Sequence, residues 1–177
     1  AGFDNPIMKF SVADLLDQLS YDQPVPKTTL GKILKLTNKA DKNSLDLALQ
    51  ALSKLGLLSR QEGDELLRNR CEELTDARLR CSSKGFCFAI RDDGGEDIYI
   101  RDHHLNHAWN GDRVLVRVTR EGGRRRSPEG EVQCILERST QSLLAQVERQ
   151  QDRLVAAPLD DRMLTSIELP TEAEEHL

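Results

Sequence analysis

Lys84-Gly85-Phe86-Cys87-Phe88-Ala89-Ile90, followed by Asp97-Ile98-Tyr99-Ile100, is the stretch of sequence that decides the fold. Successive side chains of an extended strand point to opposite faces, so we expect Phe86 and Phe88 on one face of a strand. Tyr99 joins them from a neighbouring strand. Aromatic side chains on one face of a small sheet form a platform on which unpaired bases of any sequence can stack.

The alternative is that these rings fill the interior of a barrel, and Phe88 is the ring to which it applies best, because a five-stranded barrel needs bulk inside. Lys84 and Arg101 flank the aromatic run. Aromatic side chains interleaved with basic ones fit an RNA-facing sheet better than a core. We therefore predict that Lys84, Phe86, Phe88, Tyr99 and Arg101 contact single-stranded RNA.

The hydrophobic pattern changes at residue 77 from helical to alternating. It predicts five strands, near residues 77–82, 85–91, 96–101, 112–119 and 129–137. Five short strands at this spacing favour an OB-type barrel. The loop between the last two strands carries Arg124, Arg125 and Arg126, which we expect to contact phosphates. The alternative for this basic loop is a solvated tip without a ligand.

Three helices and a hairpin are expected before the barrel. Ser11 is predicted to cap the first helix, Thr29 the second, and Ser44 to precede the third, which ends at Gly56. Short extended runs on either side of Gly63 predict the hairpin. This order is typical of a winged helix. Because the third helix lacks arginine and the hairpin tip is acidic, sequence-specific DNA binding is not favoured.

The strand pattern returns after the barrel, in the runs 142–147, 154–157 and 164–169. Three strands with open edges do not close a barrel, so we expect them to open a second OB-like domain, to add to the first barrel, or to associate with another protein or a second copy. The predicted fold class is α+β, with a winged-helix domain (8–70), a cold-shock-like OB domain (77–138), a partial second OB-like domain (141–170) and an acidic tail (171–177). Residues 1–7 are left out of this prediction.

Charge is distributed unevenly along the chain. The net charge of −5 argues against a general polyanion binder. Residues 77–138, however, carry 12 basic and 10 acidic side chains, a positive balance that suits phosphate contact. Because the excess is small, we expect weak and salt-sensitive RNA binding. No hydrophobic run approaches the roughly 18 residues of a membrane span, so we predict a cytoplasmic protein without a membrane partner.

Cysteine and histidine residues give little indication of a metal site. Four cysteines, at positions 71, 81, 87 and 134, contain no Cys-x-x-Cys pair, so reduced thiols are expected. His103, His104 and His107 form a cluster that could bind Zn²⁺, but no cysteine lies at a suitable ligand spacing. A histidine ring can instead stack on a base, and His103 is our candidate for that role.

Catalytic residues are not predicted. Asp92-Asp93 and Asp160-Asp161 are adjacent pairs next to turns, whose side chains point apart. Two-metal phosphodiester hydrolysis needs several carboxylates that converge on ions about 4 Å apart. We therefore expect no metal, no cofactor and no catalytic centre in this chain, which leaves open whether it is part of an enzyme.

The two aromatic runs and the later run Asn110-Gly111-Asp112-Arg113-Val114 resemble, in this order, the cold-shock type of OB domain. Together with the helices before them and the strands after them, they resemble the N-terminal region of the ribonuclease II/ribonuclease R family, in particular the branch found in photosynthetic bacteria. Members are processive 3′→5′ hydrolytic exoribonucleases, in which OB domains guide single-stranded RNA into a Mg²⁺-dependent catalytic domain. The resemblance implies residues of the RNA path only, because the catalytic aspartates have no counterpart here.

The sequence therefore predicts a single-stranded RNA-binding chain. On the resemblance, it is the N-terminal portion through which substrate enters a 3′→5′ exoribonuclease, with the catalytic domain of the parent enzyme as its partner and Mg²⁺ held there. The alternative is a protein-docking or regulatory module that uses the winged helix and the open sheet edge. The negative net charge and the strands at 141–169 support that alternative.

Overall fold

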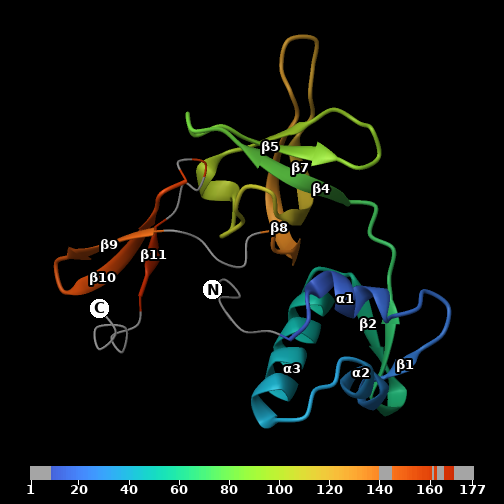
Figure 1. The fold of residues 1–177 in the computed structure, drawn as a ribbon. Helices are drawn as coiled ribbons and strands as arrows, with labels where there is room; N and C mark the ends of the chain where they lie inside the picture. The colour runs from blue at the N-terminus through green and yellow to red at the C-terminus, as the bar shows by residue number, and fades with distance from the viewer. Residues whose placement is uncertain (1–8, 140–144, 161, 163–165, 170–177) are drawn as a thin grey trace.

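A computed structural model describes residues 9–139, 145–160, 162 and 166–169. These residues form a helical module, a closed five-stranded barrel and a separate three-stranded sheet (Figure 1). In chain order, the elements are α1 (Val12–Asp17), β1 (Val25–Pro26), α2 (Lys27–Ile33), α3 (Lys39–Lys54), β2 (Leu58–Gln61), η1 (Glu62–Asp64), β3 (Glu65–Arg68), β4 (Leu74–Cys81), β5 (Cys87–Arg91), β6 (Ile98–Ile100), η2 (Asp102–His104), β7 (Arg113–Arg120), β8 (Glu129–Glu137), β9 (Ala145–Gln150), β10 (Arg153–Pro158) and β11 (Ile167–Glu168). None of the helices in this described part combines the length and apolar character that a membrane span requires.

Capping residues set the ends of two helices in the helical module. Ser11 caps α1 as predicted, in a capping box that it forms with Asp14. The prediction for the start of α3 is wrong by six residues: the helix begins after Asn38, whose side chain accepts a hydrogen bond from the Asp41 backbone N–H. Ser44 lies inside this helix, and its hydroxyl donates to the Ala40 carbonyl.

The second helix also begins before its predicted cap. Its N-cap is Pro26 rather than Thr29, because the fixed φ of proline suits the residue at a helix start. The predicted hairpin is confirmed: β2 and β3 pair antiparallel around Gly63, which has a φ of 73°. A third strand, β1, pairs with β3 through Val25 and Pro26, so the sheet order is β1-β3-β2.

The five predicted strands close into one barrel, in the order β4-β5-β6-β8-β7. Four of the pairings are antiparallel, and β6 pairs with β8 in parallel. Small and aliphatic side chains fill the interior; they include Ala77, Leu79, Ala89, Ile98, Ile100, Val114, Val116 and Val132. The predicted strand at 85–91 begins two residues late, at Cys87.

The barrel and the helical module share a hydrophobic interface. Leu115 and Leu136 point outward from β7 and β8, yet both are buried, because they join the core of the helical module. That core also contains Leu15, Leu16 and Leu49. Helix α1 therefore packs against β8, and the helical module lies at one side of the barrel (Figure 1).

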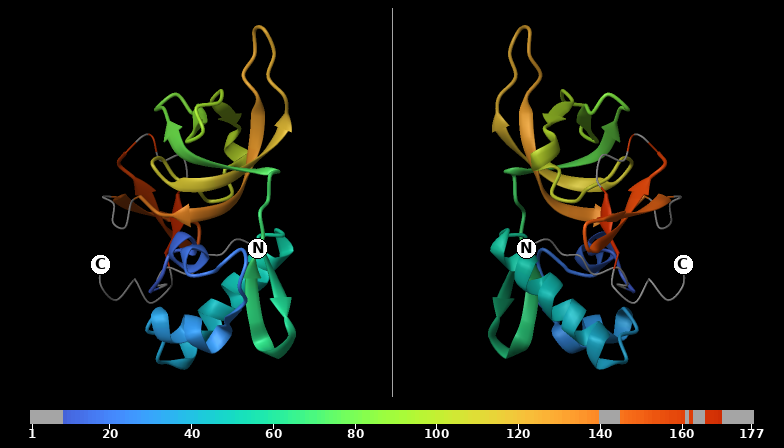
Figure 2. Two further views of the ribbon diagram at one scale, coloured as in Figure 1. Left: turned by 90° about the vertical axis from the view of Figure 1, so that its right-hand side faces the viewer. Right: turned by 90° about the vertical axis from the view of Figure 1, so that its left-hand side faces the viewer.

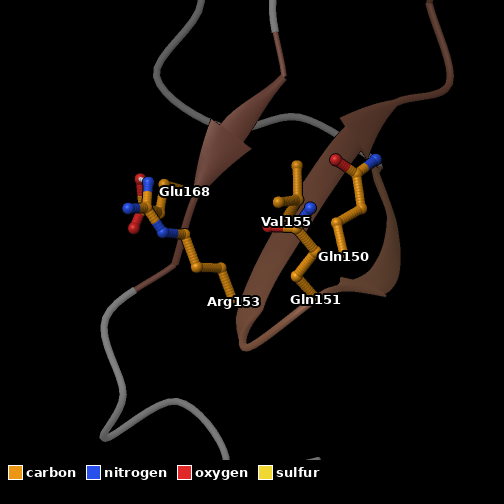
Figure 3. Close-up of a pocket in the computed structure, with 5 residues that line it drawn as sticks. All are labelled: Gln150, Gln151, Arg153, Val155 and Glu168. Carbon is orange, nitrogen blue, oxygen red and sulfur yellow. Dashed lines mark hydrogen bonds and ion pairs between the residues drawn. The ribbon is translucent and has the colours of Figure 1, made fainter.

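The last strands form a sheet of their own, in the order β11-β10-β9. They correspond to three predicted strands, although residues 142–144 and 164–165, and the predicted tail at 171–177, lie outside the described residues. A depression on this sheet is lined by Gln150, Gln151, Arg153, Val155 and Glu168 (Figure 3). Arg153 is already paired with Glu168 at 3.3 Å, so the depression offers no unpaired charge to a ligand.

Two of the four cysteines are joined, contrary to the expectation of reduced thiols. Cys81 and Cys87 lie directly opposite each other on β4 and β5, with their Cα atoms 4.1 Å apart, and form a disulfide. The hairpin brings the pair together without any Cys-x-x-Cys spacing. Cys71 and Cys134 are free.

A buried carboxylate fixes the end of the barrel. Asp112 is fully buried and accepts hydrogen bonds from the backbone N–H groups of Trp109 and Ser139, each at 2.9 Å. The Arg138 guanidinium donates a third bond at 2.9 Å and lies over the Trp109 ring. These contacts connect the start of β7 to the end of β8, and they give the Asp112 of the run Asn110-Gly111-Asp112-Arg113-Val114 a structural role.

Replacing Asp112 by alanine is expected to lower the free energy of unfolding by about 2–3 kcal/mol, because buried donors lose a charged acceptor. Urea unfolding followed by far-UV circular dichroism measures this change. Asp93→Ala is the matched control, since the exposed pair of Asp93 with Arg91 contributes little to stability. Equal unfolding midpoints for the two variants would contradict the structural role of Asp112.

Protein purified without reductant is expected to show two free thiols after unfolding, out of the four cysteines in the sequence. In the folded protein Cys71 should react before Cys134, because burial raises the pKa of the Cys134 thiol to about 12. Thiol labelling with mass spectrometry measures both. A Cys81→Ser/Cys87→Ser variant is the control, and four reactive thiols in the unreduced parent would show that the disulfide is absent.

Candidate nucleic-acid interface

The outer side of strands β4, β5 and β6 carries a row of basic and aromatic side chains. Phe88 lies opposite Arg80 on one neighbouring strand and opposite Tyr99 on the other, so the three side chains share a face. The Phe88 and Tyr99 rings are 5.5 Å apart between centroids and tilted by 51°. Arg78 and Ile90 form the next row of this surface. We call these five residues the aromatic face.

The aromatic face points away from the barrel interior. On the same strands, the alternate residues Cys87, Ala89, Ile98 and Ile100 are all buried. Phe88 and Tyr99 are only half-buried and do not belong to the core. The structure thus places Phe88 outside, and the alternative in which it fills the barrel is wrong.

Phe86 lies in the turn before β5 rather than on the strand itself. Its backbone N–H donates to the Ser82 hydroxyl, and its carbonyl accepts from the Ser82 N–H at 2.8 Å. The side chain is 51% exposed. Gly85 takes a φ of 84° in this turn, a value that L-residues rarely adopt. Phe86 and the exposed Lys84 therefore stand at one end of the aromatic face.

Arg101 stands at the margin of this face, but it is paired. Its guanidinium donates to both carboxylate oxygens of Glu129, at 3.3 and 3.4 Å. Arg120 makes a second ion pair with the same carboxylate. Hydrogen bonds from Arg101 and Arg120 lower the pKa of Glu129. The sequence did not indicate this three-residue cluster, because Glu129 lies 28 residues after Arg101.

The predicted basic loop extends from the barrel. Arg124, Arg125 and Arg126 are exposed at the tip of the β7–β8 hairpin, closed by a bridge between Gly123 and Arg126. Figures 1 and 2 show this hairpin projecting beyond the barrel, on the side away from the helical module. The three arginines are thus not brought against the aromatic face, although the hairpin begins beside it.

His103 is exposed in η2, after β6. Its backbone N–H donates to the Asp102 carboxylate at 2.8 Å, which lowers the pKa of that carboxyl group. Its ring lies 4.0 Å from the His104 ring between centroids. Within residues 9–139 and the described parts of the C-terminal sheet, no group of three His, Cys, Asp or Glu side chains could hold a metal ion.

The structure adds three arginines to those predicted for the interface. Arg78 and Arg80 share the aromatic face, and Arg120 joins Arg101 on Glu129. The alternation of β4 contained the signal for the first two, because Ala77, Leu79 and Cys81 are apolar and the residues between them must point outward. Arg120 could not be found in this way.

Comparison with known proteins assigns relatives to two parts of the chain. Residues 13–69 match the family described as "Cyanobacterial RNase R, N-terminal domain", and residues 77–135 match the "Ribonuclease B OB domain". The "Acetazolamide conferring resistance protein zam" of Synechocystis sp. (strain ATCC 27184 / PCC 6803 / Kazusa) is 48% identical over 163 residues, which are 92% of this chain and 21% of that protein. The chain thus spans about a fifth of the length of this curated relative. A solved structure of "yeast Ssd1, a pseudonuclease" aligns with 57% of this chain and 18% of its own chain, at 18% identity and a TM-score of 0.46.

Proposed function

The chain belongs to the ribonuclease II/R family through its N-terminal and OB domains, and we propose that it binds single-stranded RNA on the aromatic face. The observation that carries the proposal is the outward position of Phe88 and Tyr99 on a small barrel. Such rings accept successive bases by stacking, with little dependence on sequence. In this role the chain is the portion through which RNA enters a processive 3′→5′ hydrolytic exoribonuclease.

The proposed mechanism is capture followed by transfer. Bases stack on Phe86, Phe88 and Tyr99, while exposed arginines neutralise the phosphates between them. Lys84, Arg101, His103 and the arginines of the hairpin tip are the flanking contacts. Hydrolysis belongs to a catalytic domain of the parent enzyme, where Mg²⁺ is held, and a cytoplasmic location follows from this role.

We propose a matching organisation of domains. Residues 8–70 form a winged helix, for which the supporting features are three helices followed by the β2–β3 hairpin. Residues 77–138 are a cold-shock-like OB domain, and residues 141–170 open a second OB-like domain around β9, β10 and β11. The exposed lysines of α3 are few, so we assign the winged helix a guiding or docking role rather than base readout.

Tyr99→Ala and Phe86→Ala are each expected to cost about 1–3 kcal/mol of RNA affinity, because each variant loses a stacking ring. Fluorescence anisotropy with a labelled single-stranded RNA measures the dissociation constant. Tyr21→Ala is the matched control: Tyr21 is an exposed ring on the helical module, 37% exposed. Unchanged affinity in both Tyr99→Ala and Phe86→Ala, or the same loss in the Tyr21→Ala control, would contradict base stacking on these rings.

Replacing Arg124, Arg125 and Arg126 together by glutamine is expected to weaken RNA binding and to reduce the salt slope by about 2, because three phosphate contacts are lost at roughly 0.7 each for a single strand. The measurement is the dissociation constant at several salt concentrations. A Lys39/Lys42/Lys54→Gln variant removes equal charge from α3 and serves as the control. If the salt dependence of RNA binding is unchanged in the arginine variant, the basic tip is a solvated loop that does not contact RNA.

A protein-docking module is the second candidate, favoured by the sheet β11-β10-β9. The outermost strands of this sheet have no further pairing partner among the described residues, and Leu159 beside them is 64% exposed. A strand edge of this kind can accept a strand from another protein. An electrophoretic shift with single-stranded RNA at low and moderate salt separates the two candidates, since a docking module would give no shift in either buffer.

A further inference from the structure

The cluster of Arg101, Arg120 and Glu129 lies directly beside the Tyr99 ring. Tyr99 and Glu129 are opposed residues of the parallel β6–β8 pair, and Glu129 and Arg120 are opposed residues of β7 and β8. Arg101 follows Tyr99 by two residues. One carboxylate and two guanidinium groups thus meet at the edge of the aromatic face, at the base of the β7–β8 hairpin.

The three side chains differ in their exposure. The Arg101 and Arg120 side chains are 49% and 46% exposed, whereas Glu129 is only 18% exposed. The carboxylate therefore lies beneath two guanidinium groups whose outer N–H groups face solvent. Its backbone is fixed as well, because the Glu129 carbonyl accepts a hydrogen bond from the Thr119 hydroxyl. The cluster carries a net charge of one positive unit.

Carboxylate and phosphodiester groups bind guanidinium in the same way. Each presents anionic oxygens to the planar array of N–H donors, and arginine pairs with either through parallel hydrogen bonds. Arg101 uses this geometry now, with contacts of 3.3 and 3.4 Å to the two Glu129 oxygens. Both contacts are long for a charge-assisted bond, whereas Arg120 makes the closer contact with the same carboxylate, so Arg101 is the arginine that is more readily released to another acceptor.

We propose that Arg101 and Arg120 form a phosphodiester site for the nucleotide stacked on Tyr99, and that Glu129 is a built-in competitor for this site. This inference rests on the proposed RNA binding and identifies the protein groups that contact the phosphate next to the base stacked on Tyr99. When a base stacks on Tyr99, an RNA phosphate replaces some of the hydrogen bonds between the arginines and Glu129. When the base leaves, the arginines pair with Glu129 again.

This competition keeps the phosphate contact weak and exchangeable. An arginine pair without a nearby carboxylate would hold each phosphate more tightly and would slow the movement of the strand across the barrel. With Glu129 in place, a departing phosphate is replaced by a carboxylate within the same cluster, so the guanidinium groups are never left without an acceptor. A chain that passes RNA onward needs such reversible contacts.

Glu129→Gln tests the inference, because it removes the competing charge at nearly constant volume. Binding of a fluorescent single-stranded RNA is expected to tighten about two- to fivefold, the range of ion pairs at a protein surface, because both arginines are about half exposed, and to show a steeper salt dependence. Arg120→Ala should weaken binding. In the Glu129→Gln/Arg120→Ala double variant the gain should shrink, because half of the arginine pair is gone.

Glu137→Gln is the matched control. It removes the same charge from the opposite end of β8, where the side chain is exposed. Equal tightening in this variant would mean that only the net charge of the protein matters, and it would overturn the competitor role of Glu129. Unchanged or weaker RNA binding by Glu129→Gln, with a native circular dichroism spectrum, would overturn that role as well. A parent protein that binds no RNA would overturn the proposed function itself, which is a separate outcome of the same titration.

Discussion

Closure of the barrel depends on the parallel contact between β6 and β8, and this contact has no room for a side chain at Gly130. A Cβ atom there would lie 2.7 Å from methyl carbons of Ile98 and Val116 and 2.9 Å from the Arg117 carbonyl oxygen. The Arg117 oxygen belongs to the backbone and cannot move away as a flexible side chain could. Glycine therefore allows Ile100 and residue 130 to pair, and the sheet becomes a closed barrel without free edges.

The same closure decides what the outer surface contains. Because side chains alternate along a strand, the residue before Gly130 has to point outward, and Glu129 reaches the margin of Tyr99. The narrow interior accepts alanine, valine and isoleucine, while the larger rings of Phe88 and Tyr99 remain outside. Helix α1 covers a different side, through outward leucines of β7 and β8. Packing the helical module therefore leaves the aromatic face uncovered.

Local patterns in the sequence predicted much of this fold. The five barrel strands, the β2–β3 hairpin and the Ser11 cap follow from alternation and capping chemistry that lie within a few residues of each other. Helix starts were less accurate, because Asn38 competes with Ser44 as a cap, and only the folded helix shows that the Ser44 hydroxyl is bonded within it. Phe88 could be placed on a face, since a period of two is enough for that.

Side-chain pairings between strands could not be predicted from local patterns. The Cys81–Cys87 disulfide needs the register of a hairpin, and the Arg101–Glu129 pair needs the barrel to be closed. The sequence gives the position of each charged residue, whereas the ion pairs depend on which strands are neighbours in the folded barrel. The residues of the candidate interface were therefore easier to name than their partners.

Pairing also changes how the small positive excess of residues 77–138 is interpreted. Of the 12 basic side chains in this segment, five are held by carboxylates in the structure: Arg91, Arg101, Arg113, Arg120 and Arg138. The remaining seven have no ion pair within the described part of the chain: Arg78, Arg80, Lys84, Arg117, Arg124, Arg125 and Arg126. Three of these seven lie on or beside the aromatic face and three at the hairpin tip. A modest net charge is thus compatible with the proposed RNA-binding surface, because carboxylates pair with five of the 12 basic side chains, and six of the seven without an ion pair lie on or beside the aromatic face or at the hairpin tip.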